Sequence, residues 1–389
     1  MRRSPLPAPR SRSRMMDYVD ISAAVHSKAG IGRYAAELSR ALLAAQPERF
    51  GLFFNRGQDG RFPPDLPAAA PQRSVALGYK PWRMAVLLGQ IGRVPFNRLL
   101  PDARLFHATE HLLPPLRGVP MVLTVHDLIY KLFPAYHKKL NYWYLNLAMP
   151  LFCRRAAAII AVSQASKQDI VREYGVDPAK IHVVYEAASS RFRPLPPAEL
   201  AQARQTYSLP DQFLVHLGTL EPRKNLLRLL EALQVLRSAS FPKLCLVLAG
   251  GRGWLYDDFF ARIAALGLQD AVHVLGWVPD EDLPAILAAA DLAVQPSLYE
   301  GFGLPILEQM ACGQVVAASG VSSHPEVGGE AAVYFDPTSV AEMAAVIRRL
   351  LTDREEYRHR QQLGLAQAAQ FSWQRAARET MAVYDQLLT

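Results

Sequence analysis

The chain has 389 residues, of which 50% are hydrophobic, so it is long enough to bury two domain cores. Its formal net charge is +8, but residues 1–14 hold five arginines and no acidic residue, which leaves 8 − 5 = +3 for the rest of the chain. Because the excess charge is concentrated in one tail, it argues against a nucleic-acid-binding surface on the folded protein.

The first 15 residues are rich in Pro, Ser and Arg, and we predict that this basic tail is disordered. It lacks the apolar region of a secretory signal, and no run of 18 uncharged apolar residues suggests a membrane span. Three widely separated cysteines match no metal-ligand spacing, which indicates reduced core thiols and a cytoplasmic protein.

The folded part is expected to open with a strand over residues 17–21. A Gly-x-Gly segment over 28–34 then leads into an amphipathic helix that ends near Leu43. A glycine turn before a helix exposes backbone N–H groups, so Gly32 is a candidate phosphate contact, although a plain turn is the simpler interpretation. Residues 51–71 are rich in Pro and Gly and are interpreted as a variable region.

A buried strand predicted over residues 121–125 delivers His126-Asp127 at its carboxyl end, where ligands bind in open parallel sheets. His126 is therefore a candidate ligand contact, with a structural histidine as the alternative. His107 and Glu110-His111 are weaker candidates.

Two stretches, residues 72–100 and 131–155, are basic, free of acidic residues and interleaved with aromatics. They contain Arg73, Lys80, Arg83, Arg93 and Arg98, and Lys131, Lys138, Lys139, Arg154 and Arg155. One interpretation is a solvated helix face with core aromatics, and the other is a peripheral surface for anionic lipid.

The first half is predicted to close with a helix over 137–155, a strand over 157–162, a helix over 164–174 and a strand over 180–185. Ser163 is placed to cap the second of these helices. A linker is predicted from Pro194 to Leu209.

A second alternation of strands and helices predicts another parallel α/β sheet. Its strands are expected over 213–217, 244–248, 272–275, 292–295, 315–318 and 332–335. The final helix is expected to begin near Ser372-Trp373 and to run to Leu387.

The first strand of this half ends at Gly218 and is followed by Glu221-Pro222-Arg223-Lys224-Asn225. Two adjacent cations at a helix start oppose the helix dipole, so a bound anion explains them better than simple exposure does. Arg223 and Lys224 are therefore candidates for binding a diphosphate.

The stretch from Pro296 to Glu308 joins the buried strand ending at Gln295 to a helix start marked by Pro305. The amides of Gly301, Phe302, Gly303 and Leu304 favour an anion. Glu300 and Glu308, the latter expected in the first helical turn, suit hydroxyl groups. A ligand with both features is a sugar nucleotide.

This Glu-x7-Glu stretch and the Arg-Lys segment resemble the donor-binding motifs of the retaining family 4 glycosyltransferases, and the likeness extends over the chain after residue 15. The resemblance implies an α/β GT-B fold, two Rossmann-like domains facing across a cleft. We expect an acceptor-side domain over 16–195, a donor domain over 196–371, and a terminal helix over 372–389 that crosses back to the first domain.

The resemblance also assigns roles. Arg223 and Lys224 would stabilise the departing diphosphate, Glu308 would bind the ribose diol, Glu300 would bind sugar hydroxyls, and His126 would contact the sugar. Val278 would lie beside the nucleotide base, with a strand end as the alternative. No cofactor and no metal are expected, since the cation pair supplies the positive charge.

Other positions match the family less completely. Ser163 and Lys167 correspond to residues that face the family's cleft, and Glu326 is a candidate supporting residue. The chain has Glu186-Ala187-Ala188 where Asn-Gly is usual, and Gln314 where proline is usual. With no carboxylate nucleophile evident beside His126, the resemblance implies front-face substitution with retention.

The resulting hypothesis is a hexosyltransferase, with GDP-mannose as the predicted donor and a glycan or lipid-linked glycan as the acceptor. It would act in envelope or exopolysaccharide synthesis and be cytoplasmic, with peripheral contact to the inner membrane as an open extension. The alternatives are a soluble enzyme making a small glycoside, a sugar-nucleotide epimerase of the same fold and, outside the enzymes, a nucleic-acid-binding protein.

Overall fold

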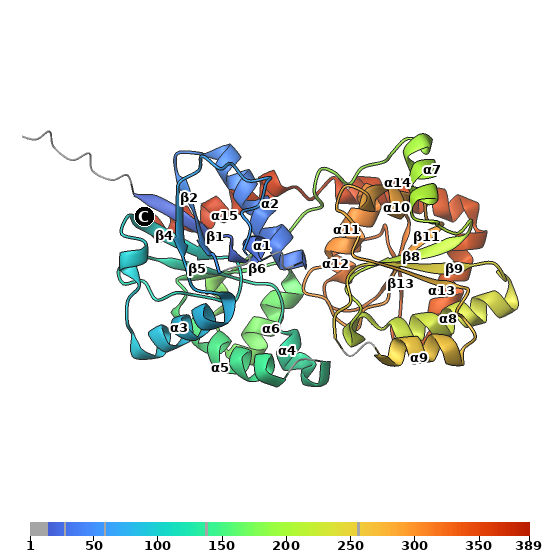
Figure 1. Ribbon diagram of the computed structural model, residues 1–389, viewed down its shortest axis with the longest axis horizontal. Coiled ribbons are helices and arrows are strands. Elements are labelled where there is room, and N and C mark those ends of the chain that lie inside the picture. Colours follow the sequence, from blue (N-terminus) through green and yellow to red (C-terminus); the bar gives the residue numbers. More distant parts are fainter. Residues whose placement is uncertain (1–14, 27–28, 58–59, 137–138, 255–256) are drawn as a thin grey trace, which may run out of the picture. The chain divides into compact units, whose positions relative to one another are not determined.

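The computed structural model describes residues 15–389 except 27–28, 58–59, 137–138 and 255–256, and it contains two parallel β-sheets covered by helices (Figure 1). The chain divides into two compact units. The first holds the described residues up to Leu123, Arg155–Ala158 and Tyr384–Thr389, and the second holds Thr124–Arg154 and Ile159–Val383. The predicted basic tail, up to residue 14, lies outside the described residues, and the domain boundary at residues 195 and 196 stays a prediction.

The first sheet has the strand order β3-β2-β1-β4-β5-β6-β7. Its strands are β1 Met16–Asp20, β2 Phe50–Asn55, β3 Gln72–Val75, β4 Ala103–Ala108, β5 Met121–Val125, β6 Ala158–Ala161 and β7 Ile181–Val183. The accompanying α-helices are α1 Ser22–Val25, α2 Ala29–Ala45, α3 Tyr79–Gly92, α4 Ile129–Leu132, α5 Lys139–Arg155 and α6 Gln164–Tyr174, and the 3-10 turns are η1 Asn97–Leu99, η2 Pro134–Tyr136 and η3 Pro178–Lys180.

Two interpretations of the N-terminal half were wrong. The region assigned as variable from residue 51 begins inside β2, whose six residues are all buried because Phe50–Asn55 is an almost continuous apolar run. The helix α2 begins at Ala29, so Gly32 lies within it rather than in a turn that precedes it. A Cβ on Gly32 would come within 2.9 Å of the Ala23 carbonyl oxygen, so close packing is a sufficient reason for this glycine.

The second sheet has the order β10-β9-β8-β11-β12-β13. Its strands are β8 Phe213–Leu217, β9 Cys245–Ala249, β10 Val272–Gly276, β11 Leu292–Gln295, β12 Val316–Ser319 and β13 Val333–Phe335. The remaining helices are α7 Pro197–Thr206, the 3-10 turn η4 Pro222–Lys224, α8 Leu226–Ala239, α9 Asp257–Ala265, α10 Leu283–Ala288, α11 Leu304–Ala311, α12 His324–Gly328, α13 Val340–Thr352, α14 Arg354–Ala368 and α15 Trp373–Leu388. The predicted linker thus contains the ten-residue helix α7.

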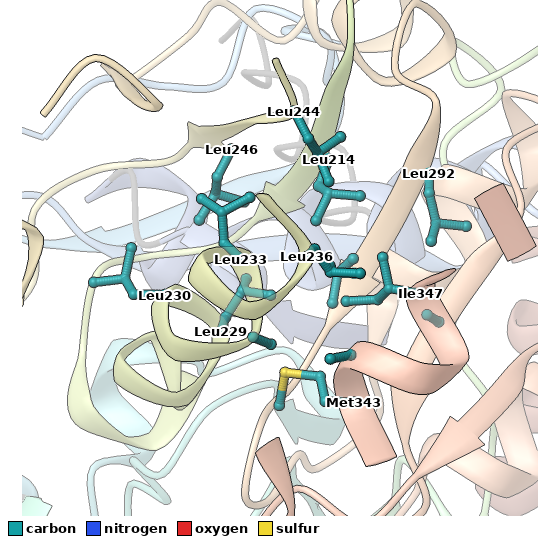
Figure 2. Packing of buried hydrophobic residues seen from close by; sticks show 14 of the residues in the cluster. Leu214, Leu229, Leu230, Leu233, Leu236, Leu244, Leu246, Leu292, Met343 and Ile347 are labelled. Carbon is teal, nitrogen blue, oxygen red and sulfur yellow. The ribbon is translucent and has the colours of Figure 1, made fainter. Parts of the chain in front are cut away.

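The core on one face of the second sheet explains why these segments fold as they do. Leucines recur along α8 at the spacing of one helical face, and they pack on the sheet together with Met343 and Ile347 of α13 (Figure 2). The strands facing them, including β8 and β11, are buried along their whole length. A buried apolar strand of this kind ends where the chain leaves the sheet, and the polar residues of the following loop begin there.

No described helix combines the length and hydrophobicity that crossing a bilayer would require.

Candidate functional site

The loop between β11 and α11 carries most of the residues predicted for donor binding. Gly303 caps α11 with φ +102°, a left-handed conformation that residues with a Cβ rarely adopt. Leu304 and Pro305 are the first two helical residues. The predicted strand, glycine loop and helix are therefore confirmed.

The position of Glu308 in the first helical turn was wrong. Because α11 starts at Leu304, Glu308 is its fifth residue, and its side chain is buried at 1% exposure. The amide-rich end of the helix is formed by Gly303 and Leu304, with Glu308 one turn further along.

Glu300 joins the two predicted cations in one buried ion cluster. Its Oε1 accepts a hydrogen bond from Nζ of Lys224 at 2.6 Å, and its Oε2 pairs with Nη1 of Arg223 at 2.6 Å. The three side chains are only 8–12% exposed. The hydroxyl of Ser297 donates to the same Oε1 at 2.6 Å. Sequence reasoning had assigned the carboxylate and the cations to different parts of the ligand, and the structure brings them into direct contact.

The cluster shifts the pKa values of Glu300 and Arg223 in opposite directions. Burial alone would raise the pKa of Glu300, but the charges of Arg223 and Lys224 outweigh it and hold that pKa well below its usual range. Burial would lower the pKa of Arg223, but Glu300 and Glu221 raise it. Glu300 and Arg223 are therefore both charged at neutral pH.

Arg223 also fixes the geometry of the loop. Its Nη1 donates to the Tyr299 carbonyl at 2.8 Å, and its own carbonyl accepts from the Leu298 N–H at 2.9 Å. A further carboxylate, Glu221, bonds to Nη2 of Arg223. The sequence pattern did not single out Glu221 as a site residue, although its position two residues before Arg223 indicates a possible ion pair.

Glu300 is held at its backbone as well as at its side chain. Its N–H donates to the Ser322 hydroxyl at 2.9 Å, and its carbonyl accepts from the Ser323 hydroxyl at 3.0 Å. These serines belong to the segment between β12 and α12. The carboxylate orientation is thus determined by three separate segments.

Gly301 lies directly against the loop after β5. A Cβ at this position would be 2.1 Å from the carbonyl oxygen of His126, so no other residue fits without a backbone shift. The Gly301 carbonyl accepts from the hydroxyls of Ser163 and Ser166, and Ser166 also donates to the His126 carbonyl at 2.8 Å. Both segments belong to the second unit.

The imidazole of His126 pairs with a carboxylate that was not predicted. Its Nδ1 lies 3.2 Å from Oε1 of Glu186, 60 residues further along the chain. The family's Asn-Gly position after β7 is thus occupied by a buried acidic residue. The structure thus places a carboxylate beside His126 because two separate strand ends meet at this point.

The other predicted binding residues have defined but less informative positions. Gly218 follows β8, and a Cβ there would come within 3.3 Å of Cε of Lys224. Val278 is buried just after β10, and Phe302 is buried against the rings of Tyr185 and Phe371. Gly32 belongs to the first unit, whereas the other residues predicted to bind the donor belong to the second.

The weaker candidates are engaged in structural contacts. Nζ of Lys167 donates to the Ile181 carbonyl at 2.7 Å, and buried His107 bonds to the Tyr384 hydroxyl at 2.6 Å. Ser163 caps α6 as expected. Glu326 accepts from the N–H groups of Gln164 and Ala165, so its carboxylate lies at the amino end of that helix.

Both basic stretches present apolar residues to solvent. On α3, Met84, Leu88 and Ile91 are 48%, 60% and 55% exposed and share one helix face. On α5, Trp143 is 69% exposed, so it is not a core aromatic, whereas Trp82 of the first stretch is. Lys80 and Arg93 flank the α3 stripe and are exposed, and Lys138 of the second stretch lies outside the described residues.

Known proteins match this chain in both halves. The family profile described as Glycosyl transferases group 1 matches residues 201–365, and the profile described as Glycosyltransferase Family 4 matches residues 29–188. O-antigen chain mannosyltransferase B of Escherichia coli is 35% identical over 372 residues, which cover 92% of this chain and 96% of that protein.

A further relative and a solved structure complete the comparison. The serotype-specific mannosyltransferase WbdA of Escherichia coli is 34% identical over 238 residues, 60% of this chain but only 29% of WbdA. The crystal structure of Anabaena HepE in complex with UDP and glucose has a TM-score of 0.74 at 22% identity and covers 96% of this chain and 100% of HepE. The structural likeness confirms the predicted fold class, two Rossmann-like α/β domains of the GT-B type.

Proposed function

Because the chain belongs to the glycosyltransferase family described as Glycosyl transferases group 1 and Glycosyltransferase Family 4, we propose that it transfers mannose from GDP-mannose to a growing glycan. The observation that carries the choice of sugar is the likeness, along almost its whole length, to an O-antigen chain mannosyltransferase. The acceptor is then a glycan or lipid-linked glycan of a cell-envelope or extracellular polysaccharide.

The buried ion cluster supports the chemistry of this proposal. Breaking the bond between a sugar and a diphosphate leaves negative charge on the diphosphate, and preorganised cations stabilise that charge. Arg223 and Lys224 are held in place by Glu300, and α11, which begins four residues after Glu300, adds the backbone dipoles of its amino end. We assign leaving-group stabilisation to these groups, without a metal ion.

The steric outcome is part of the proposal. Departure of the diphosphate and attack of the acceptor on the same face of the sugar would retain the anomeric configuration. Glu308 would bind the ribose and Glu300 would orient the sugar hydroxyls that lie nearest to it. NMR of the product linkage tests retention, and undiminished turnover in the presence of a metal chelator tests metal independence.

The donor is tested by thermal unfolding in the presence of candidate ligands. A ligand present at about 100 times its Kd stabilises the folded state by about 2.7 kcal/mol. GDP-mannose and GDP should raise the unfolding temperature, and UDP-glucose and UDP-N-acetylglucosamine should not. Stabilisation by a uridine nucleotide alone would contradict the proposed donor.

We also propose that the enzyme works at the cytoplasmic membrane surface. The apolar stripe Met84, Leu88 and Ile91, flanked by exposed Lys80 and Arg93, has the composition of an interfacial helix. Three buried free cysteines fit a reducing compartment.

Vesicle flotation tests this placement. The protein should float with phosphatidylglycerol vesicles and not with phosphatidylcholine vesicles, and Leu88→Glu should abolish flotation. The matched control is Leu365→Glu, a leucine that is 37% exposed on α14. Equal flotation of both variants would contradict an interfacial role for α3.

A further inference from the structure

We infer that Glu186 is a positioning residue for His126, an inference that rests on the proposed function. The carboxylate accepts the Nδ1–H of the imidazole and thereby holds the ring in one orientation towards the donor sugar. Glu186 would thus determine how the ring is presented to the substrate.

The geometry of the pair is well defined. Oε1 of Glu186 lies 3.2 Å from Nδ1 of His126, and the two side chains are 5% and 11% exposed. His126 immediately follows β5, and Glu186 comes three residues after the end of β7. The pair therefore joins two loops at the carboxyl ends of parallel strands, where ligands bind in folds of this class.

The burial of Glu186 needs an explanation. A carboxylate that is 4% exposed loses most of its hydration, which is costly unless a charged or hydrogen-bonding partner compensates. Among the described residues, the side-chain partner that the structure gives this carboxylate is His126. A solvent-exposed acid on the same loop would avoid that cost, so the contact itself accounts for the placement.

The direction of the hydrogen bond follows from the chemistry of the two groups. An ionised carboxylate only accepts, so the ring nitrogen facing it carries the proton. This fixes the tautomer of a neutral imidazole. Nδ1–H is thus committed to Glu186, and this bond sets the orientation of the ring.

The backbone of His126 is held independently of Glu186. Its carbonyl accepts from Ser166, and Gly301 packs directly against it. Removing the Glu186 carboxylate should therefore free the ring to rotate without moving the loop. This separation makes a positioning role testable without loss of the fold.

A double-mutant cycle measures the coupling. With GDP-mannose as the donor and GDP release as the readout, Glu186→Ala should lower kcat at least about tenfold with little change in KM. Glu186→Gln should retain at least about a third of the activity, because its amide oxygen can still accept Nδ1–H. In a His126→Ala background, Glu186→Ala should cost less than about twofold. A full tenfold loss in that background would overturn the inference, since Glu186 would then act without His126.

The tautomer is read directly by nitrogen NMR of protein labelled at histidine, with His126→Ala identifying the resonances. We expect Nδ1 to carry the proton, and Glu186→Ala to shift the population towards Nε2–H. A wild-type ring protonated at Nε2 alone overturns the inference. Because this measurement needs no turnover, an inactive enzyme with the expected tautomer would refute the proposed donor and leave the positioning contact standing.

Discussion

Lys224 and Glu300 form a buried ion pair in which Nζ lies 2.6 Å from Oε1, although 76 positions separate them in the chain. Lys224 belongs to the turn after β8, and Glu300 belongs to the loop after β11. The strands β8 and β11 are hydrogen-bonded neighbours in the second sheet, so their carboxyl ends lie side by side. The topology of the sheet thus creates the pair.

Removing Glu300 should strongly destabilise the protein. Glu300→Ala would leave Arg223 and Lys224 buried with one carboxylate fewer, and breaking a buried pair typically costs about 3–5 kcal/mol. The free energy of unfolding from urea denaturation measures this loss. The control is Glu231→Ala, which breaks a partly exposed pair with Arg262 and should change it by less than about 1 kcal/mol. Equal effects of the two variants would contradict the assignment of a buried cluster.

Turnover should depend on the two cations of the donor site and on the Glu308 carboxylate. We expect Arg223→Ala, Lys224→Ala and Glu308→Ala each to lower kcat at least about tenfold, equivalent to about 1.4 kcal/mol of transition-state stabilisation. GDP release from GDP-mannose measures the rate. The control Arg358→Ala removes an exposed arginine of α14 and should leave the rate unchanged. Near-normal rates in all three variants would refute the site assignment.

A methyl group on Gly301 should disrupt the site. Its Cβ would lie 2.1 Å from the carbonyl oxygen of His126. Hydrogen bonds hold the backbone of both residues in place, so neither can easily move away. Gly301→Ala should therefore unfold at a lower temperature and lose donor-induced stabilisation. Gly92→Ala is the matched control, because its Cβ would make only an ordinary 3.6 Å contact at the end of α3. If Gly301→Ala behaved like Gly92→Ala, the close approach of the two loops would be wrong.

Stability should fall between pH 7 and pH 5. Burial, assisted by the charge of Lys224, lowers the pKa of His216 from 6.5 to about 4. Burial also lowers the pKa of His324 from 6.5 to about 4, although Glu300 opposes the shift. Because the unfolded chain binds protons in this interval and the folded chain does not, the free energy of unfolding decreases as the pH falls from about 6.5 towards 4.

Each of these two histidines should contribute on the order of 2 kcal/mol to the difference between pH 7 and pH 5. Urea denaturation at the two pH values measures it. His216→Asn and His324→Asn should each reduce the pH dependence, whatever their effect on stability at pH 7. A dependence that is unchanged in both variants would show that other groups cause it.

The parts of the fold that the sequence predicted well are those with strong local patterns. The strands β8 and β11 have the expected bounds, because fully buried parallel strands are short apolar runs. The exposed edge strand β3 was missed because Gln72–Val75 is mostly polar. The helix α7 was read as linker because its helical signal is weak between flanking prolines.

The features of the candidate site also differ in how well the sequence predicts them. The glycine loop, the cations and both glutamates of the Glu-x7-Glu stretch are recognisable from short segments of sequence. The partnership of Glu186 with His126, by contrast, joins residues 60 positions apart that no local pattern links.

The sequence by itself therefore determined the class of fold, the family and the residues from which the site is built, since apolar periodicity and short motifs are properties of neighbouring residues. Only the tertiary structure decided which of those residues touch. That Glu300 holds Arg223 and Lys224 follows from two neighbouring parallel strands ending at a common edge, whereas Gly301 packs on the loop after a strand of the other sheet. The 2.6 Å distances between these ions depend on how the ends of the two strands align in three dimensions. No single stretch of sequence contains that information.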